Sequence, residues 1–192
     1  MSFKCLPKDV TGEIEIYRFG TFYRLTSCMY ASGLCGTDLD YGLDEFLPTT
    51  VSDSEFGAAI RRCHDATRFE DLDALPSGEA AKAANREWTK KLVLWKRKAL
   101  EMTGYKNLDK LYEDARYSSS FRTKEMYVFS NSSLKKPTEF SSIPDHFPDC
   151  REFIVEQPAS DEMLGQTARA ALDAGVRNAR RPPDRVMYHV RD

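Results

Sequence analysis

Alternating apolar and polar positions predict two antiparallel hairpins. The pattern runs through residues 13–19 and, after Gly20, less cleanly through residues 21–28. A second pair of such segments covers residues 119–123 and 125–130. Further short strands are expected at residues 45–47, 152–156 and 186–190, the last of them at a sheet edge. The chain is therefore expected to be rich in short strands that are joined by turns and longer loops.

Apolar residues three or four positions apart predict helices between these strands. One helix begins at Ser52, whose hydroxyl can cap the free backbone N–H groups while Glu55 reaches back to it. Another begins at Ser160, followed by Asp161 and Glu162, where the helix dipole favours negative charge. A short helix is expected from 108 to 115, with Asn107 as its cap.

The longest helix is expected from Gly78 to Thr103, because Gly104 is a natural C-cap. Its apolar stripe includes Trp88 and Trp95, one heptad apart. This spacing could mark a seam for a partner helix, but together with Val93 and Leu94 it forms a wide apolar face that fits a helix docked across the protein's own sheet. We expect the second arrangement.

The segment 51–60 is repeated at 159–168. The Ser, Asp and Gly of a Ser-Asp-x-x-x-Gly pattern keep their spacing, and Asp65-Ala66 matches Asp173-Ala174 in the same register. Each copy follows a strand-rich stretch, so a strand-strand-helix unit is used twice. We predict a single α+β domain over residues 1–192, with a mostly antiparallel sheet, pseudo-repeats at about 13–68 and 118–176, a helical insert at about 78–116 packed on the sheet, and a basic tail at 177–192.

Composition narrows the class of protein. The 192 residues carry a net charge of −2 and are 41% hydrophobic, as in an ordinary globular protein and unlike a basic nucleic-acid binder. No apolar run is long enough for a membrane helix, and the N-terminus has no apolar signal core, so we expect a cytoplasmic protein without a membrane partner. The five cysteines are odd in number and scattered, which indicates reduced thiols and no metal site.

Catalytic chemistry is not indicated by any motif. The three histidines are His64, beside Cys63 on the first predicted helix, His146, in a proline-flanked turn, and His189, near the chain end. Neighbouring residues on a helix project from different faces, so Cys63 and His64 do not form a catalytic pair, and a surface or half-buried position is expected for His64. No phosphate-binding loop or nucleophile elbow is present. We therefore expect no catalytic residue, no cofactor and no enzyme activity.

Charge is unevenly distributed along the chain. Between Asp38 and Asp73 there are ten acidic and three basic residues, a balance of −7, so the remainder carries +5. A Gly-flexed loop within this segment combines carboxylates with an aromatic residue. Its members are Asp38, Asp40, Tyr41, Asp44 and Glu45. Such a loop could fill a basic cleft of a partner protein by charge complementarity, although solvated turns would look the same.

The order of these elements resembles the immunity proteins of bacterial contact-dependent growth inhibition systems. The resemblance covers roughly residues 14–173 and is carried by three segments, 51–66, 95–115 and 159–174. The middle segment includes Gly-Tyr-Lys-Asn-Leu and Leu-Tyr motifs. The sequence departs from this pattern in its long, proline-rich segment 137–150 and in its basic tail, which has no counterpart.

The resemblance implies a non-enzymatic protein that binds and neutralises the toxic C-terminal domain delivered by a neighbouring cell. The acidic loop then suggests that the toxin is a nuclease, since a nuclease needs a basic cleft for phosphates. On this hypothesis, replacing Asp38, Asp40 and Asp44 with Asn should slow toxin association without unfolding the protein.

Two alternatives remain open at this stage. One is a small ligand-binding protein or enzyme, with a pocket between the pseudo-repeats and His64 or the cysteines as working groups. The other is a nucleic-acid surface built from the basic residues of the long helix and the tail. We expect no direct nucleic-acid contact, and the sequence leaves the oligomeric state undetermined.

Overall fold

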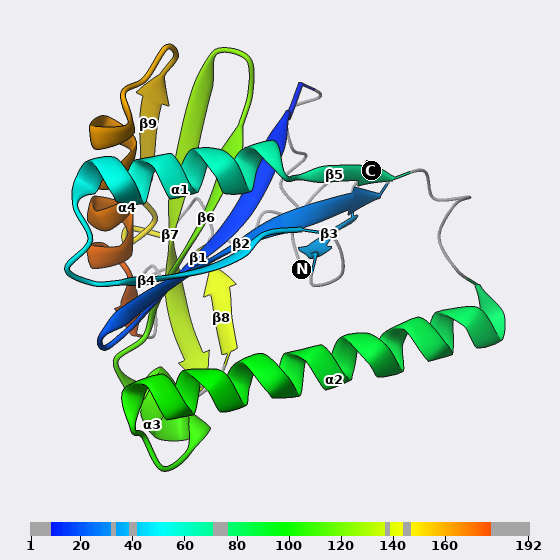
Figure 1. Cartoon of the computed structure of the whole chain (residues 1–192). Helices are drawn as coiled ribbons and strands as arrows, with labels where there is room; N and C mark the ends of the chain where they lie inside the picture. The colour runs from blue at the N-terminus through cyan, green and yellow to red at the C-terminus, as the bar shows by residue number, and fades with distance from the viewer. Residues whose placement is uncertain are drawn as a thin grey trace, which may run out of the picture.

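A twisted, largely antiparallel sheet with two helices on one face forms the body of the molecule, shown by the computed structural model (Figure 1). The structure describes residues 9–31, 34–38, 42–70, 77–136, 139–143 and 147–177. The strands are β1 (Gly12–Phe19), β2 (Phe22–Ala31), β3 (Leu34–Thr37), β4 (Asp44–Pro48), β5 (Arg68–Glu70), β6 (Arg116–Arg122), β7 (Met126–Lys136), β8 (Glu139–Ser142), β9 (Glu152–Glu156) and β10 (Val176–Arg177). The helices are α1 (Asp53–Asp65), α2 (Gly78–Thr103), α3 (Leu108–Glu113) and α4 (Asp161–Asp173).

Strands β1 and β6 pair at the middle of the sheet, and each continues into a hairpin. β1 pairs with β2, which pairs in turn with β4, and β6 pairs with β7, which pairs in turn with β9, all antiparallel. The far end of β2 pairs with β3 and β5, and the far end of β7 pairs with β8 and β10. Within the described residues, the strand order therefore leaves β4 and β9 paired on one side only.

The main core lies between this sheet and the helix pair. α1 covers β1, β2 and β4, whereas α4 covers β6, β7 and β9. Ile14, Ile16 and Leu25 point from the sheet towards Phe56, Ile60 and Leu164 of the helices, all of them buried. Strand alternation explains this arrangement, because every second residue of β1 meets the helices.

The two helices contact each other directly at glycines. A Cβ atom added to Gly57 of α1 would lie 1.7 Å from the carbonyl oxygen of Asp161, and one added to Gly165 of α4 would lie 2.0 Å from that of Asp53. No side chain fits between the helices at these points. The glycines of the repeated Ser-Asp-x-x-x-Gly pattern therefore permit backbone contact between α1 and α4.

Two arginines clamp this crossing in a reciprocal way. Arg61 of α1 donates to Asp161 Oδ1 at 2.9 Å and to the carbonyl oxygen of Ala159 at 2.9 Å. Arg169 of α4 donates to Asp53 Oδ1 at 2.7 Å and to the carbonyl oxygen of Val51. Each guanidinium thus binds the carboxylate in the first turn of the opposite helix.

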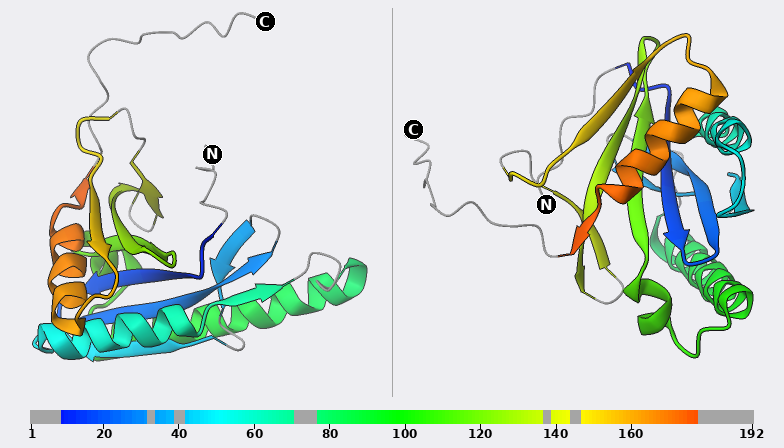
Figure 2. Two further views of the ribbon diagram at one scale, coloured as in Figure 1. Left: turned by 90° about the horizontal axis from the view of Figure 1, so that it is seen from above. Right: turned by 90° about the vertical axis from the view of Figure 1, so that its left-hand side faces the viewer.

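A second, smaller core holds one end of α2 against the β1–β2 turn. Trp95 and Ala99 pack there with Phe19, Phe22 and Tyr112. The remainder of α2 extends past the sheet (Figures 1 and 2). Val93 is 51% exposed and Leu94 60%, so the expectation of a wide apolar face docked on the sheet was wrong for these two residues. Trp95 is buried as expected, and Trp88 is half-buried.

Several predicted elements are confirmed. α1 has the capping box of Ser52 and Glu55, α4 is capped by Ser160, and α2 ends at Gly104 in the left-handed conformation. The α+β class and the mostly antiparallel sheet are also confirmed. The equivalence of the two pseudo-repeats stays a prediction, and the strand expected at 186–190 lies outside the described residues.

We predict that Gly57→Ala and Gly165→Ala each lower the free energy of unfolding by about 2 kcal/mol or more, measured by urea denaturation. Alanine favours a helix interior by about 1 kcal/mol, but the added methyl group forces the helices apart, and overpacking of this kind is the larger effect. Gln166→Ala is the control, because this neighbour of Gly165 is exposed and should change stability by less than about 0.5 kcal/mol. Equal stability of the glycine variants and the control would show that the crossing tolerates a side chain.

Candidate partner-binding surface

The described carboxylates of the predicted acidic loop form ion pairs with arginines of the same chain. Asp38 is 5% exposed, and its carboxylate lies 3.2 Å from Arg68 Nη1. Asp44 accepts from Arg24 Nε at 2.7 Å and from Nη2 at 3.2 Å. Glu45 accepts from Arg62 Nε at 2.9 Å and from Nη2 at 2.8 Å. Asp40 and Tyr41 lie outside the described residues, so their role stays a prediction.

Other carboxylates of the acidic segment are also paired within the chain. Asp53 binds Arg169, Asp65 binds Arg122, and Glu70 binds Arg68. Of these partners, Arg122 and Arg169 come from distant positions in the sequence, as Arg24 does for Asp44. The local balance of −7 therefore does not produce an equally negative surface, because arginines from other elements neutralise it.

Asp44 supports a buried cation. The Arg24 side chain is only 3% exposed, and its guanidinium lies 4.1 Å from the centre of the Trp95 ring. A carboxylate partner offsets the lost hydration of a buried arginine, and a cation–π contact adds to this stabilisation. Asp44 thus joins β4 to the second core, which gives it a structural role whether or not it meets a partner.

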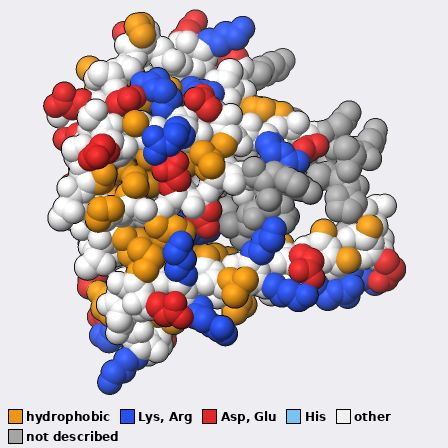
Figure 3. All heavy atoms as spheres, in the orientation of Figure 1, with side chains coloured by type: hydrophobic (Ala, Val, Ile, Leu, Met, Phe, Trp, Pro, Cys, Tyr) orange, Lys and Arg blue, Asp and Glu red, His pale blue; other side chains and the backbone are white. Residues whose placement is uncertain are grey.

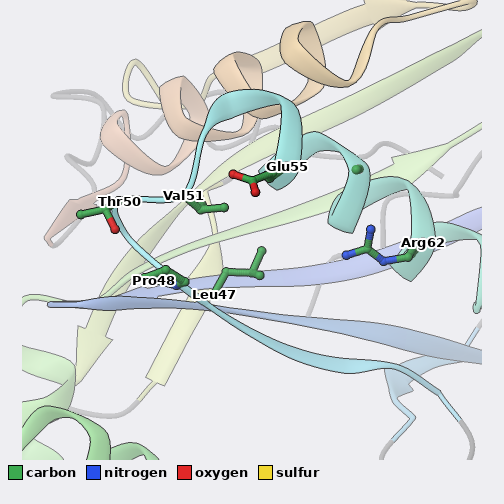
Figure 4. Close-up of a pocket in the computed structure, with 7 residues that line it drawn as sticks. Leu47, Pro48, Thr50, Val51, Glu55 and Arg62 are labelled. Carbon is green, nitrogen blue, oxygen red and sulfur yellow. The ribbon is translucent and has the colours of Figure 1, made fainter.

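A groove of about 510 Å³ lies between β4 and the start of α1 (Figure 4). Leu47, Pro48 and Val51 form its apolar floor, and Ala58 of α1 lines it as well. The carboxylate of Glu55 and the guanidinium of Arg62 stand at its rim in Figure 4. The groove is open, because within the described residues β4 pairs with β2 only.

The charges at the rim are held in place by hydrogen bonds. Glu55 accepts from the Ser52 hydroxyl at 2.6 Å and from the Ser52 backbone N–H at 3.2 Å, which lowers the pKa of its carboxyl group. The hydrogen bond to Glu45 raises the pKa of Arg62. The Arg62 side chain is 53% exposed, so part of it stays available at the surface. The groove therefore presents both signs of charge at fixed positions.

On its other side, β4 borders the C-terminal half of α2. The Lys98 ammonium lies 4.0 Å from the centre of the Phe46 ring, and Phe46 packs on Phe22. The views agree that β4 lies between α1 and α2 on one side of the molecule (Figures 1 and 2). Figure 3 shows hydrophobic atoms with charged groups around them between these helices. We call this region the β4 surface. It comprises Phe46, Leu47, Pro48, Thr50, Val51, Glu55, Ala58, Arg62 and Lys98.

Most of the β4 surface was missed by the sequence prediction, which included only Glu45 at its margin. One signal was available: Pro48 at the end of a short strand indicates a sheet edge, because proline cannot donate to a neighbouring strand. The groove itself could not be predicted, since Ala58 and Arg62 reach it only when α1 folds back over β4.

Of the groups considered for catalysis, His64, Cys28 and Cys63 are buried in the core. His64 is fully buried, contrary to the expected surface or half-buried position, and its Nε2 lies 3.1 Å from Ser120 Oγ. Cys28 and Cys63 are buried thiols, and burial with nearby Glu45 raises the pKa of Cys63 to about 12. Among the described residues, no group of three or more His, Cys, Asp or Glu is placed to hold a metal ion. His146 and His189 lie outside them.

We predict that His64 makes stability fall in mild acid. Burial, with the nearby charge of Arg122, lowers the pKa of His64 to about 3, whereas the unfolded chain takes up this proton near pH 6.5. The part of the free energy of unfolding that depends on neutral His64 is fully present above pH 6.5 and is lost as the pH falls towards 3. Between pH 7 and pH 5, urea denaturation should show about 2 kcal/mol more loss for the native protein than for His64→Phe. Parallel pH profiles would contradict it.

We predict that Asp44→Asn costs about 2 kcal/mol of stability, because it leaves the buried Arg24 without its carboxylate. Urea denaturation tests this against Glu156→Gln, which changes an exposed carboxylate on β9 and should change stability little. The earlier expectation for Asn at Asp38, Asp40 and Asp44 therefore needs correction, since at least Asp44 supports the fold. An Asp44→Asn variant as stable as the control would show that Arg24 does not depend on this pair.

Comparisons with known proteins agree with this architecture. The structure is similar to a protein of unknown function, NMB0488, from Neisseria meningitidis, with a TM-score of 0.71 and 16% identity over 85% of this chain and 94% of that one. It is also similar to a chain of the CdiA-CT/CdiI toxin and immunity complex from Yersinia pseudotuberculosis, with a TM-score of 0.67 and 15% identity over 87% of this chain and 99% of that one.

At these identities the two structures establish a shared fold. No curated protein matches the sequence significantly. None of the helices in the described part has the length and apolar character to span a membrane. The family model described as CdiI, CDI immunity protein, matches residues 12–175, which is most of the chain. The chain therefore belongs to the CdiI family of CDI immunity proteins.

Proposed function

We propose that this protein binds the cognate C-terminal toxin domain of a contact-dependent growth inhibition system and neutralises it in the cytoplasm, without chemistry of its own. Membership of the CdiI family carries this proposal. The similar chain from Yersinia pseudotuberculosis belongs to a toxin and immunity complex, which supports a toxin as the partner. The burial of His64 and Cys63 supports a binding role, because neither group is open to a substrate.

The β4 surface is the proposed contact site. Stable protein interfaces have an apolar centre and a polar rim, and here Phe46, Leu47 and Pro48 are flanked by the charged residues Arg62 and Lys98. Phe46 and Leu47 are partly exposed, whereas the apolar side chains on the inner face of α1 are buried in the main core. A partner that binds at these exposed residues leaves the core side chains in place.

We further propose that the toxin is a nuclease, whose basic substrate cleft meets the carboxylates on the α1 side of the β4 surface. Glu55 lies there, Glu45 lies there in its pair with Arg62, and Asp40 and Tyr41 precede β4 closely in the sequence. Complementary charge would speed association and block access for phosphates. Asp38 and Asp44 contribute mainly by holding Arg68 and Arg24 in place.

The alternative function, a ligand-binding protein or enzyme with a pocket between the two units, gains no support. α1 and α4 are in backbone contact at Gly57 and Gly165, and buried apolar side chains fill the space beneath them. A ligand would have to separate the helices to enter. The groove at β4 lies at the edge of the sheet, away from this crossing.

Co-expression with the toxin domain encoded beside its gene tests the proposal. The native protein should restore growth and form a tight complex. Ala58→Arg should abolish protection and weaken binding at least about a hundredfold, because the long side chain occupies the groove. Calorimetric titration measures the affinity.

Gln166→Arg is the matched control, because Gln166 occupies the corresponding position on α4 and is exposed there. It should bind and protect like the native protein. Protection by Ala58→Arg equal to that of the control would remove the β4 surface from the interface, whereas failure of the native protein to bind would refute the function itself.

A further inference from the structure

Basic and aliphatic side chains form a stripe along the outward side of α2. At 100° per residue, Arg86, Lys90, Val93 and Arg97 succeed one another at steps of four, three and four, opposite Trp95. All four are exposed, Val93 by 51%. We call these residues the α2 stripe. Its twelve residues, from 86 to 97, correspond to roughly 16 Å along the helix axis.

The stripe contributes little to holding α2 in place. Trp95 and Ala99, on the other side, anchor the helix in the second core. Among the described residues, Lys90 pairs only with Glu87 of the same helix, and both side chains are more than half exposed. α2 carries seven basic and three acidic residues, a balance of +4. Figure 3 shows basic groups along this extended helix. A role in solubility would explain the exposed charges of α2, but it would not explain the exposed aliphatic side chains of Val93 and Leu94 among them.

The composition of the stripe favours one kind of partner. A second copy binding through the same helix would bring +4 against +4, which repels. Nucleic acid would meet Glu87 and Glu101 beside the stripe and would gain little from aliphatic Val93 at its centre or Leu94 next to it. A protein surface with carboxylates around an apolar centre matches both features.

The stripe is continuous with the β4 surface. Lys98 reaches the Phe46 ring of β4, and Leu94 lies one helical turn before Lys98 with 60% of its surface exposed. Leu94 therefore connects the two regions around the side of α2. A protein domain seated on β4 is large enough to cover both.

We propose that the toxin domain meets the α2 stripe with an acidic patch that has an apolar centre and lies outside its basic substrate cleft. This inference rests on the proposed toxin-binding function. On its α1 side the binding face then carries Glu55 and the Glu45–Arg62 pair, which together leave one negative charge, and on its α2 side it carries excess positive charge. Opposed charges at its two sides orient the toxin during encounter, so that one docking direction is favoured.

The test measures association of the toxin domain encoded beside the gene with two triple variants of the full chain. Arg86→Glu/Lys90→Glu/Arg97→Glu reverses the stripe. Lys106→Glu/Lys124→Glu/Arg151→Glu makes the same change in net charge at exposed positions elsewhere. The stripe variant should associate about tenfold more slowly than the control at about 0.05 M salt, and the difference should shrink at about 0.5 M salt because screening removes steering.

A second variant, Val93→Ser/Leu94→Ser, should raise the dissociation rate at either salt concentration, since it removes the apolar centre. Equal rates for the stripe variant and the control would overturn the inference while leaving toxin binding intact. Reduced binding of total cellular RNA by the stripe variant, with unchanged toxin binding, would also overturn it. If the native protein fails to bind the toxin, the proposed function fails and the inference with it.

Discussion

Backbone contact between α1 and α4 is the constraint on which the rest of the structure depends. Gly57 and Gly165 let each helix lie against the first turn of the other, and Arg61 and Arg169 fasten the crossing from both sides. Once α1 is held there, its inner face covers β1, β2 and β4, and its outer margin stands beside the β4 edge. The groove is a consequence of this placement, because Ala58 and Arg62 are brought to β4 by the same helix that Gly57 positions.

Ion pairs are a second organising interaction, and they make the surface less acidic than the sequence of the acidic segment suggests. Asp44 stabilises a buried arginine, and Asp38, Asp53 and Asp65 each bind an arginine from another element. Carboxylates engaged in this way offer less attraction to a partner, since their field is largely cancelled at short distance. α2 differs from the acidic segment, because its seven basic residues outnumber its three acidic ones and leave the helix with a net charge of +4.

Local chemistry could be predicted from the sequence wherever it depends on a few neighbouring residues. The capping box at Ser52, the cap at Ser160 and the left-handed Gly104 are examples, because backbone N–H groups and a glycine's φ angle determine them locally. The exposure of Val93 and Leu94 was not predictable in this way, since apolar spacing does not show how much of a long helix meets the sheet. Burial of His64 was missed because its partners in the core, Ser120 and the Tyr127 ring, lie more than fifty residues away in the sequence.

α1 and α4 differ at the positions that form the groove beside β4. Counted from their capping serines, Glu55, Ala58 and Arg62 of α1 correspond to Met163, Gln166 and Ala170 of α4. The shared positions, Ser, Asp, Gly and Arg, build the crossing, whereas these three differ in charge and size. A groove with an ionised rim therefore exists beside β4, while the corresponding side of α4 exposes Met163. Because Glu55 completes the capping box at Ser52 and Arg62 pairs with Glu45, the groove gains its charged rim from residues that also stabilise α1 and β4, and not from the crossing.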